Sequence, residues 1–169
     1  MLFAHSLTQS KQLDRKPKES SKRRRKKEMN KAVLRFDGGC LGNPGKMYGS
    51  YHIRFNDTVA LEESKFQLGH GTNNVAEFLA LIRGLNALEK MCLQEHANPR
   101  DTVVSVFTDS MIVKNRLTGK NKVHSKPEWK SRSEVMFNLA NECLALLRQY
   151  CSFTVEWEGR SKNVAVFGH

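Results

Sequence analysis

Residues 32–45 read AVLRFDGGCLGNPG, and the fold is best predicted from this stretch outward. It begins with an apolar run, 32–36, whose branched and aromatic residues favour a β-strand. Asp37 ends the run, and residues 38–45 then hold four glycines and a proline. Such a cluster predicts a tight loop. A carboxylate between a strand and a glycine-rich loop is a candidate functional residue.

Two further acidic residues stand in comparable contexts. Glu77 lies in TNNVAE, in the first turns of a helical pattern, and Asp109 lies in FTDS, at the end of a second strand-like run. Carboxylates brought together from three such elements bind hard divalent cations, and pairs of these ions catalyse phosphodiester hydrolysis. We therefore predict a site for two Mg²⁺ or Mn²⁺ ions at Asp37, Glu77 and Asp109.

The other patterns predict an alternation of strands and helices. Apolar residues recur at helical spacing from 75 to about 91, after the capping residues Thr72-Asn73-Asn74. Further helices are predicted at 110–117, 131–150 and 160–169, and strands at 32–36, 48–55, 58–68, 101–108 and 152–157. A basic connection broken by Pro127 spans 120–130. This order predicts an α/β fold with a mixed five-stranded sheet, three antiparallel strands and then parallel ones, flanked by helices.

The positive charge is concentrated at the N-terminus. The chain has 169 residues and a net charge of +11, of which residues 1–31 carry +8. This balance indicates a polyanionic partner. We predict a disordered basic tail over 1–30 and one folded domain over 31–169. The run KRRRKK at 22–27 fits a nucleic-acid tether or a nuclear address as well as it fits a solubilising tail.

The cysteines and the apolar runs exclude several classes of protein. None of the four cysteines has a C-x-x-C spacing, so we expect reduced thiols rather than disulfides or a zinc site. No apolar run approaches the ~18 residues of a membrane span, and the first residues are too polar for a secretory signal. We expect a cytoplasmic monomer.

Three motifs resemble those of the type 1 ribonuclease H family, in its short form without a hybrid-binding module. They are DGGCLGNPG at 37–45, TNNVAE at 72–77 and TDS at 108–110, and the likeness covers about 31–169. The resemblance implies an endonuclease that hydrolyses the RNA strand of RNA/DNA hybrids by a two-metal-ion mechanism. It also implies that the RNA strand is contacted by Gly38, Cys40, Asn43, Asn73 and Asn74. Asparagine amides suit 2′-hydroxyls, because both groups donate and accept hydrogen bonds.

The chain departs from the family pattern near its C-terminus. The family has Asn-x-x-Ala-Asp there, whereas Asn163-Val164-Ala165 is followed by Val166, so the fourth carboxylate is absent. His169 lies one helical turn beyond Val166, and we predict that it replaces this metal ligand. The alternative is that His169 is a frayed terminus and that three carboxylates suffice. Many members carry a histidine in the preceding loop, where Arg160 is the nearest polar candidate.

Two other functions remain open at this point. One is a catalytically weakened module of the same fold that only binds hybrids or RNA, and the other is a structure-specific DNA nuclease. The presence of all three acidic residues argues against the first. The asparagines suited to 2′-hydroxyls argue against the second. Likewise, the basic stretch from Lys114 to Arg132, which includes Trp129, fits either a grip on the DNA strand or a solvated face.

Overall fold

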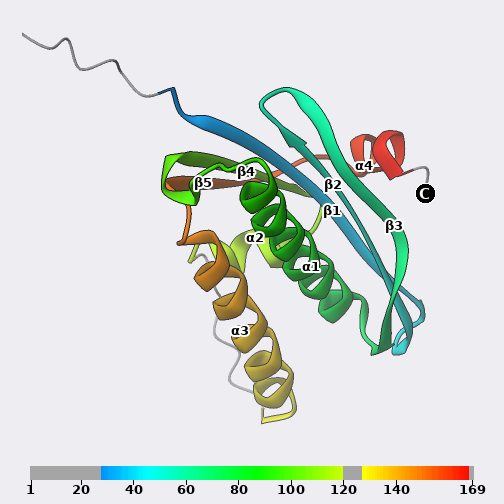
Figure 1. Ribbon diagram of the computed structural model, residues 1–169. Coiled ribbons are helices and arrows are strands. Elements are labelled where there is room, and N and C mark those ends of the chain that lie inside the picture. The colour runs from blue at the N-terminus through cyan, green and yellow to red at the C-terminus, as the bar shows by residue number, and fades with distance from the viewer. Residues whose placement is uncertain (1–27, 120–126, 168–169) are drawn as a thin grey trace, which may run out of the picture.

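The apolar run at 32–36 lies in the central strand of a five-stranded sheet. The computed structural model describes residues 28–119 and 127–167 of the chain. In chain order the elements are β1 (Asn30–Gly42), β2 (Gly45–Phe55), β3 (Thr58–Gly71), α1 (Asn73–Gln94), the short 3₁₀ helix η1 (Pro99–Asp101), β4 (Thr102–Thr108), α2 (Met111–Leu117), α3 (Pro127–Leu147), β5 (Ser152–Trp157) and α4 (Arg160–Phe167). Figure 1 shows their arrangement.

The sheet has the predicted mixed topology, with strand order β3-β2-β1-β4-β5. The pairs β1–β2 and β2–β3 are antiparallel, and β1–β4 and β4–β5 are parallel. The predicted turn between the second and third strands is confirmed. Asn56 and Asp57 there have positive φ values of 48° and 65°, as a two-residue type I′ hairpin requires.

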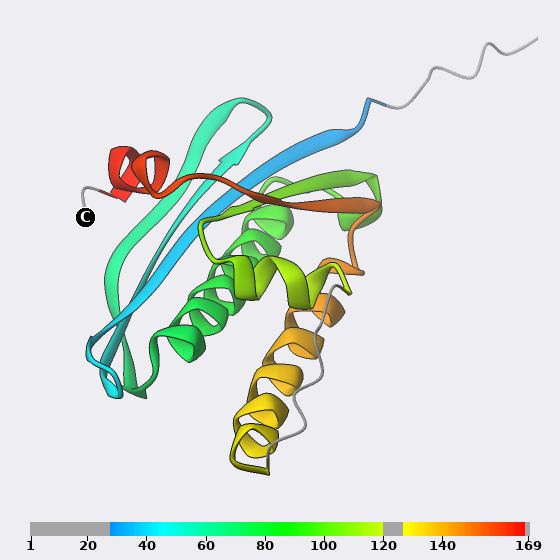
Figure 2. The ribbon, with the colours of Figure 1, turned by 180° about the vertical axis from the view of Figure 1, so that it is seen from behind.

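Alternation along β1 divides its side chains between the two faces of the sheet. Ala32, Leu34 and Phe36 are buried on the face that packs against α1. Helix α1 presents Phe78, Leu81, Leu85 and Leu88 to this core at helical spacing, all of them fully buried or nearly so. Helix α3 packs beside α1 on the same side of the sheet (Figures 1 and 2).

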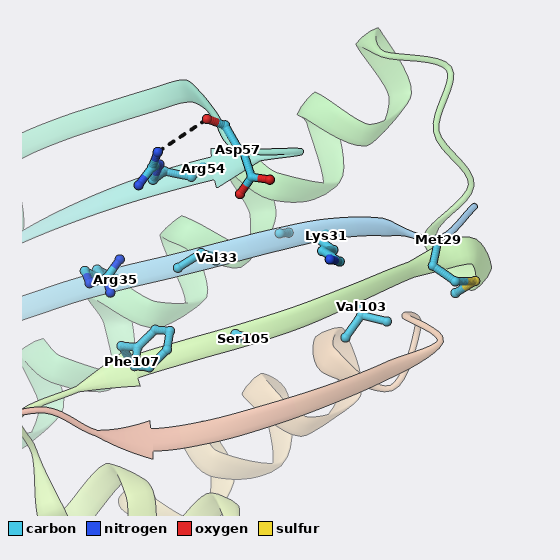
Figure 3. Close-up of a pocket in the computed structure, with 10 residues that line it drawn as sticks. Met29, Lys31, Val33, Arg35, Arg54, Asp57, Val103, Ser105 and Phe107 are labelled. Carbon is cyan, nitrogen blue, oxygen red and sulfur yellow. Dashed lines mark hydrogen bonds between the residues drawn. The ribbon is translucent and has the colours of Figure 1, made fainter.

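The opposite face of the sheet is only partly covered. Val33 and Arg35 of β1 lie beside Val103 and Phe107 of β4, and with Lys31 and Arg54 they line a shallow cavity of about 470 Å³ (Figure 3). The guanidinium carbon of Arg35 lies 4.7 Å from the centroid of the Phe107 ring. Helix α4 lies on this side of the sheet (Figures 1 and 2).

Several predicted boundaries are wrong, among them the following two. The expected loop over 38–45 is instead the end of β1, a turn at Asn43 and Pro44, and the start of β2. The glycine-rich stretch can continue as paired strand because Gly38 lies opposite Gly49 and Gly42 lies opposite Gly45 in the antiparallel ladder, so no side chains meet at these pairs. The long helix begins at Pro127 rather than at 131. Proline is tolerated at the first helical position, where its missing N–H has no intrahelical partner.

The predicted tail over 1–30 falls largely outside the described residues, as do residues 120–126 of the basic connection and His169. The folded part begins slightly earlier than predicted, because Asn30 already belongs to β1 and its side-chain oxygen accepts a 3.0 Å hydrogen bond from Asn56. Among the described residues, none of the helices is both long and apolar enough to span a membrane.

Candidate active site

The parallel register of β1 and β4 brings two of the three predicted carboxylates side by side. Arg35 of β1 pairs with Phe107 of β4, where the ladder ends. Asp37 lies two residues further along β1, and Asp109 lies two residues beyond Phe107, directly after the end of β4. Because side chains alternate along a strand, these two carboxylates continue the same row of the sheet. The prediction that Asp37 ends its strand is wrong. Asp37 lies within β1, where it pairs with Ser50 of β2.

Glu77 reaches the same place because α1 approaches β1 very closely. Gly38 is buried, and a Cβ built on it would lie 2.4 Å from the backbone carbon of Ala76 and from the backbone nitrogen of Glu77. Only glycine allows this approach without displacing the helix. The first turns of α1 are thereby held directly beside Asp37.

The three carboxylates form one cluster. Ligand oxygens of Asp37, Glu77 and Asp109 all lie within 4.8 Å of one another. They line a cavity of about 550 Å³ together with Gly38, Gly39, Cys40, Tyr48, Asn73, Trp157 and Arg160. Glu77 is buried, whereas Asp37 and Asp109 are half-buried.

The cluster is electrostatically incomplete. Burial, followed by the charges of Asp37 and Asp109, raises the pKa of Glu77 to about 9, although a hydrogen bond from the Gly38 backbone acts in the opposite direction. Oε2 of Glu77 is buried and has no hydrogen-bond partner among the described residues. A buried carboxylate oxygen without a partner is costly, and a divalent cation supplies what it lacks. The residues present therefore fit a hard metal ion.

The predicted substrate-contacting residues lie mostly beside this cluster. The Asn73 side-chain oxygen accepts a 2.9 Å hydrogen bond from the Cys40 backbone N–H, and the Asn73 N–H donates to Asn43 Oδ1 at 3.4 Å. Thr72 is the N-cap residue of α1 but makes no side-chain capping bond. The polar side chains at this helix start therefore connect α1 to the β1–β2 turn rather than cap the helix.

The structure groups some of the predicted site residues and separates others. Gly38, Cys40 and Asn73 line the cavity, whereas the exposed Asn43 and Asn74 are not among its lining residues. Tyr48 also lines the cavity, although it was not expected to be a site residue. It lies opposite Gly39 in the β1–β2 ladder, and no sequence pattern indicated that pairing.

Comparison with known proteins agrees with this geometry. The family model described as RNase H matches residues 29–158. The chain belongs to the RNase H family. The predicted resemblance and the predicted fold are thereby confirmed.

Two relatives differ in how much of their own length this chain matches. The bifunctional protein Rv2228c of Mycobacterium tuberculosis is 33% identical over 134 residues, which are 79% of this chain but 32% of that protein. A ribonuclease H of Marinobacter nauticus is 28% identical over 128 residues, which are 75% of this chain and 78% of that protein. The chain thus spans about a third of the length of the mycobacterial relative.

Among solved structures, LC11-RNase H1 in complex with an RNA/DNA hybrid is similar with a TM-score of 0.56. The two chains are 27% identical, and the match covers 79% of this RNase H family chain and 89% of the other.

Proposed function

We propose that this chain hydrolyses the RNA strand of RNA/DNA hybrids. The observation that carries this proposal is the cluster of Asp37, Glu77 and Asp109, whose oxygens lie within 4.8 Å of one another in an open cavity. The three side chains would hold two divalent ions, Mg²⁺ or Mn²⁺. When bound, such ions stabilise the negative charge that develops on the phosphate and leaving oxygen during phosphodiester hydrolysis.

Residues around the carboxylates suit a nucleic-acid strand. The Nδ2 group of Asn73 makes no hydrogen bond to the described residues, so it can donate to a 2′-hydroxyl while its oxygen remains bound to Cys40. Arg160 supplies a cation at the cavity wall, where it can contact a phosphate. Gly38, Asn43 and Asn74 complete the proposed RNA-contacting set.

The comparisons support the same reaction. The Marinobacter relative is named ribonuclease H, and LC11-RNase H1 has been crystallised with an RNA/DNA hybrid. A module that only binds nucleic acid does not need a buried carboxylate oxygen without a partner, since that oxygen weakens the fold. We therefore favour the nuclease over the binding module.

The test is cleavage of labelled RNA/DNA, RNA/RNA and DNA/DNA duplexes with Mg²⁺ or Mn²⁺. We expect cleavage of the RNA strand of the hybrid alone. Asp37→Asn and Asp109→Asn should each lower the rate by at least about 10²-fold, because each removes a metal-binding charge but keeps the side-chain shape. Hybrid affinity should survive in both variants.

Asp57→Asn is the matched control, since Asp57 is exposed in the β2–β3 turn and its positive φ suits asparagine. It should cleave at the wild-type rate. Near-wild-type turnover in Asp37→Asn or Asp109→Asn would overturn the site. Cleavage of DNA/DNA, or hybrid binding without cleavage in the wild-type chain, would favour the DNA nuclease or the binding module respectively.

His169 belongs to the same proposal, although it lies outside the described residues. We propose that its imidazole takes the position of the missing fourth carboxylate. An imidazole nitrogen suits Mn²⁺ better than the oxygen-preferring Mg²⁺.

A further inference from the structure

Two adjacent residues at the end of β5, Trp157 and Glu158, connect both aspartate-bearing strands to α4. The indole Nε1–H of Trp157 donates a 3.1 Å hydrogen bond to the main-chain carbonyl of Asp109. The backbone N–H of Glu158 donates to the carbonyl of Thr108, at 2.9 Å. The β4 end that carries Asp109 is therefore held at two consecutive carbonyls.

The Glu158 side chain extends this connection to β1. Its carboxylate accepts hydrogen bonds of 3.2 Å and 3.3 Å from Nε and Nη2 of Arg35, and one of 3.3 Å from Nζ of Lys162 in α4. Arg35 lies two residues before Asp37, so both side chains belong to the same face of β1. Glu158 is 8% exposed, and a glutamate so buried requires charged partners such as these.

We infer that Trp157 and Glu158 act as a positioning pair for the carboxylate cluster: Trp157 fixes the main chain of Asp109, and Glu158 fixes the β1 segment that leads to Asp37. This inference rests on the proposed metal-dependent function. Neither residue is a catalytic residue in this assignment, because neither offers a ligand to the cation. Their effect is on the separation of the two aspartates, and therefore on how tightly an ion is bound.

If Trp157 only stabilised the fold, we would expect its side chain to be buried in the core and to bond to a core element. Trp157 remains 48% exposed at the cavity, so it contributes less to the core than a buried tryptophan does. Its indole hydrogen bond goes to the main chain of a carboxylate residue rather than to a core element. Ser110 follows Asp109 in the chain, and its backbone N–H donates a hydrogen bond to Thr108 Oγ1. Its side-chain oxygen accepts a hydrogen bond from the Val113 N–H and so caps α2. The Asp109 main chain is thus held from both sides.

The decisive variant is Trp157→Phe, which keeps an aromatic ring but loses the N–H donor. Glu156→Gln is the matched control, because Glu156 is an exposed residue of the same strand. Two readouts do not depend on cleavage: Mn²⁺ affinity by titration calorimetry, and hydrogen–deuterium exchange of residues 108–113 in chelator. Urea unfolding establishes that each variant is folded under the assay conditions.

In Trp157→Phe we expect Mn²⁺ affinity to fall about tenfold, the scale seen when a residue that supports a metal ligand is removed. Exchange over 108–113 should accelerate, and kcat should fall while KM for the hybrid stays within twofold. Saturating Mn²⁺ should restore most of kcat. Glu158→Gln should also weaken Mn²⁺ binding, and Glu156→Gln should match the wild type in all readouts.

Failure of the positioning role can be distinguished from failure of the proposed function. If Trp157→Phe leaves Mn²⁺ affinity and exchange unchanged in a wild-type chain that binds Mn²⁺ and cleaves hybrids, the positioning role is wrong. A merely structural role would lower the free energy of unfolding of the folded variant without a change in its Mn²⁺ affinity, and this result also overturns the inference. If the wild-type chain binds no Mn²⁺ and cleaves nothing, the proposed function fails instead, and a positioning pair for a metal site fails with it.

Discussion

At the scale of single residues, Glu77 shows most directly what the site demands. It is a buried carboxyl beside two other carboxyls, and burial followed by those charges raises its pKa to about 9. At neutral pH the metal-free protein therefore keeps Glu77 protonated. A cation must displace that proton, so metal binding and proton release are linked at this position.

The first prediction concerns the stability of the metal-free protein. The unfolded chain loses the Glu77 proton near its ordinary pKa of 4.5, whereas the folded chain keeps it to about 9. Between these values the folded state binds more protons, so the Glu77 contribution to the free energy of unfolding falls as pH rises. Glu77→Gln should remove this decline and stabilise the apo protein at pH 7–8.

Urea unfolding in chelator at pH 5, 6, 7 and 8 measures the effect. Glu142→Gln, an exposed change on α3, serves as the control and should keep the wild-type pH slope. Equal slopes for Glu77→Gln and the wild type would show that Glu77 ionises normally in the folded state. Activity should be abolished in Glu77→Gln in either case, because a neutral amide is a poor ligand for Mg²⁺.

The second prediction concerns His169. If its imidazole is the fourth ligand, His169→Ala should lower hybrid cleavage at least about tenfold with Mn²⁺ and less with Mg²⁺. Steady-state rates at matched metal concentrations test this. His96→Asn is the control, since His96 is exposed beyond the C-terminal end of α1 and has a positive φ that asparagine tolerates. Full activity of His169→Ala with both metals would show that three carboxylates suffice.

At the scale of elements, the packing of α1 against β1 determines whether the carboxylates meet. The parallel pairing of β1 and β4, which runs to Arg35 and Phe107, brings Asp37 and Asp109 to the same end of the sheet, but Glu77 comes from helix α1. Its backbone comes very close to β1 at Gly38, where no side chain intervenes. The same packing buries Ala76 and Glu77, so fold and site depend on one glycine.

The third prediction is that Gly38→Ala moves α1 away from β1. An added Cβ 2.4 Å from helix backbone atoms cannot be relieved by a side-chain rotation. We expect the free energy of unfolding to fall by about 1–3 kcal/mol, as for other overpacked sites, together with weaker Mn²⁺ binding. Urea unfolding and titration calorimetry measure the two effects.

Gly84→Ala, a change within α1 itself, provides the comparison. Its Cβ would lie 2.9 Å from Leu34 Cδ1, a side-chain atom that can shift, and Gly84 lies about two helical turns beyond Glu77. Stability should change while Mn²⁺ affinity stays at the wild-type value. If both alanine variants weaken Mn²⁺ binding equally, the close approach at Gly38 has no specific role in the site.

At the scale of the whole molecule, charge is distributed unevenly between the tail and the domain. Residues 1–27 contain ten Lys or Arg and two Asp or Glu, so they hold +8 of the net +11. The domain itself is only mildly basic, and its cavity carries three acidic side chains. Affinity for a polyanion should therefore depend strongly on the tail.

The fourth prediction is that deletion of residues 1–27 weakens hybrid binding and flattens its salt dependence, while the fold stays intact. The slope of log K against log salt should become shallower by about 0.9 for each phosphate that the tail neutralises in the full-length chain. The deletion stops at 27 because β1 begins at Asn30. Affinity for a labelled hybrid across salt concentrations, with circular dichroism for the fold, measures the effect.

Replacing residues 22–27 by glutamine in the full-length chain separates charge from length. This variant should reproduce much of the deletion effect, because the run KRRRKK holds six of the positive charges. Equal salt slopes for the wild type and both variants would show that the tail does not touch the substrate.

Local sequence patterns were sufficient to predict the order of the elements, the mixed sheet and the three carboxylates. Ala32, Leu34 and Phe36 alternate with polar or less buried residues along β1, and the buried residues of α1 recur at helical spacing. Motifs such as DGGCLGNPG combine a carboxylate with glycines, so they could be interpreted without knowledge of distant contacts.

What those residues touch became known only from the packing of the folded chain. The glycine-rich stretch is paired strand rather than loop, because Gly38 and Gly42 face glycines of β2, and Pro127 begins a helix that it was expected to precede. The bond from Trp157 to the Asp109 carbonyl joins residues 48 positions apart, and that from Glu158 to Arg35 joins residues 123 apart. Local propensity cannot specify such pairs, since they form only when the sheet register and helix packing bring distant segments together.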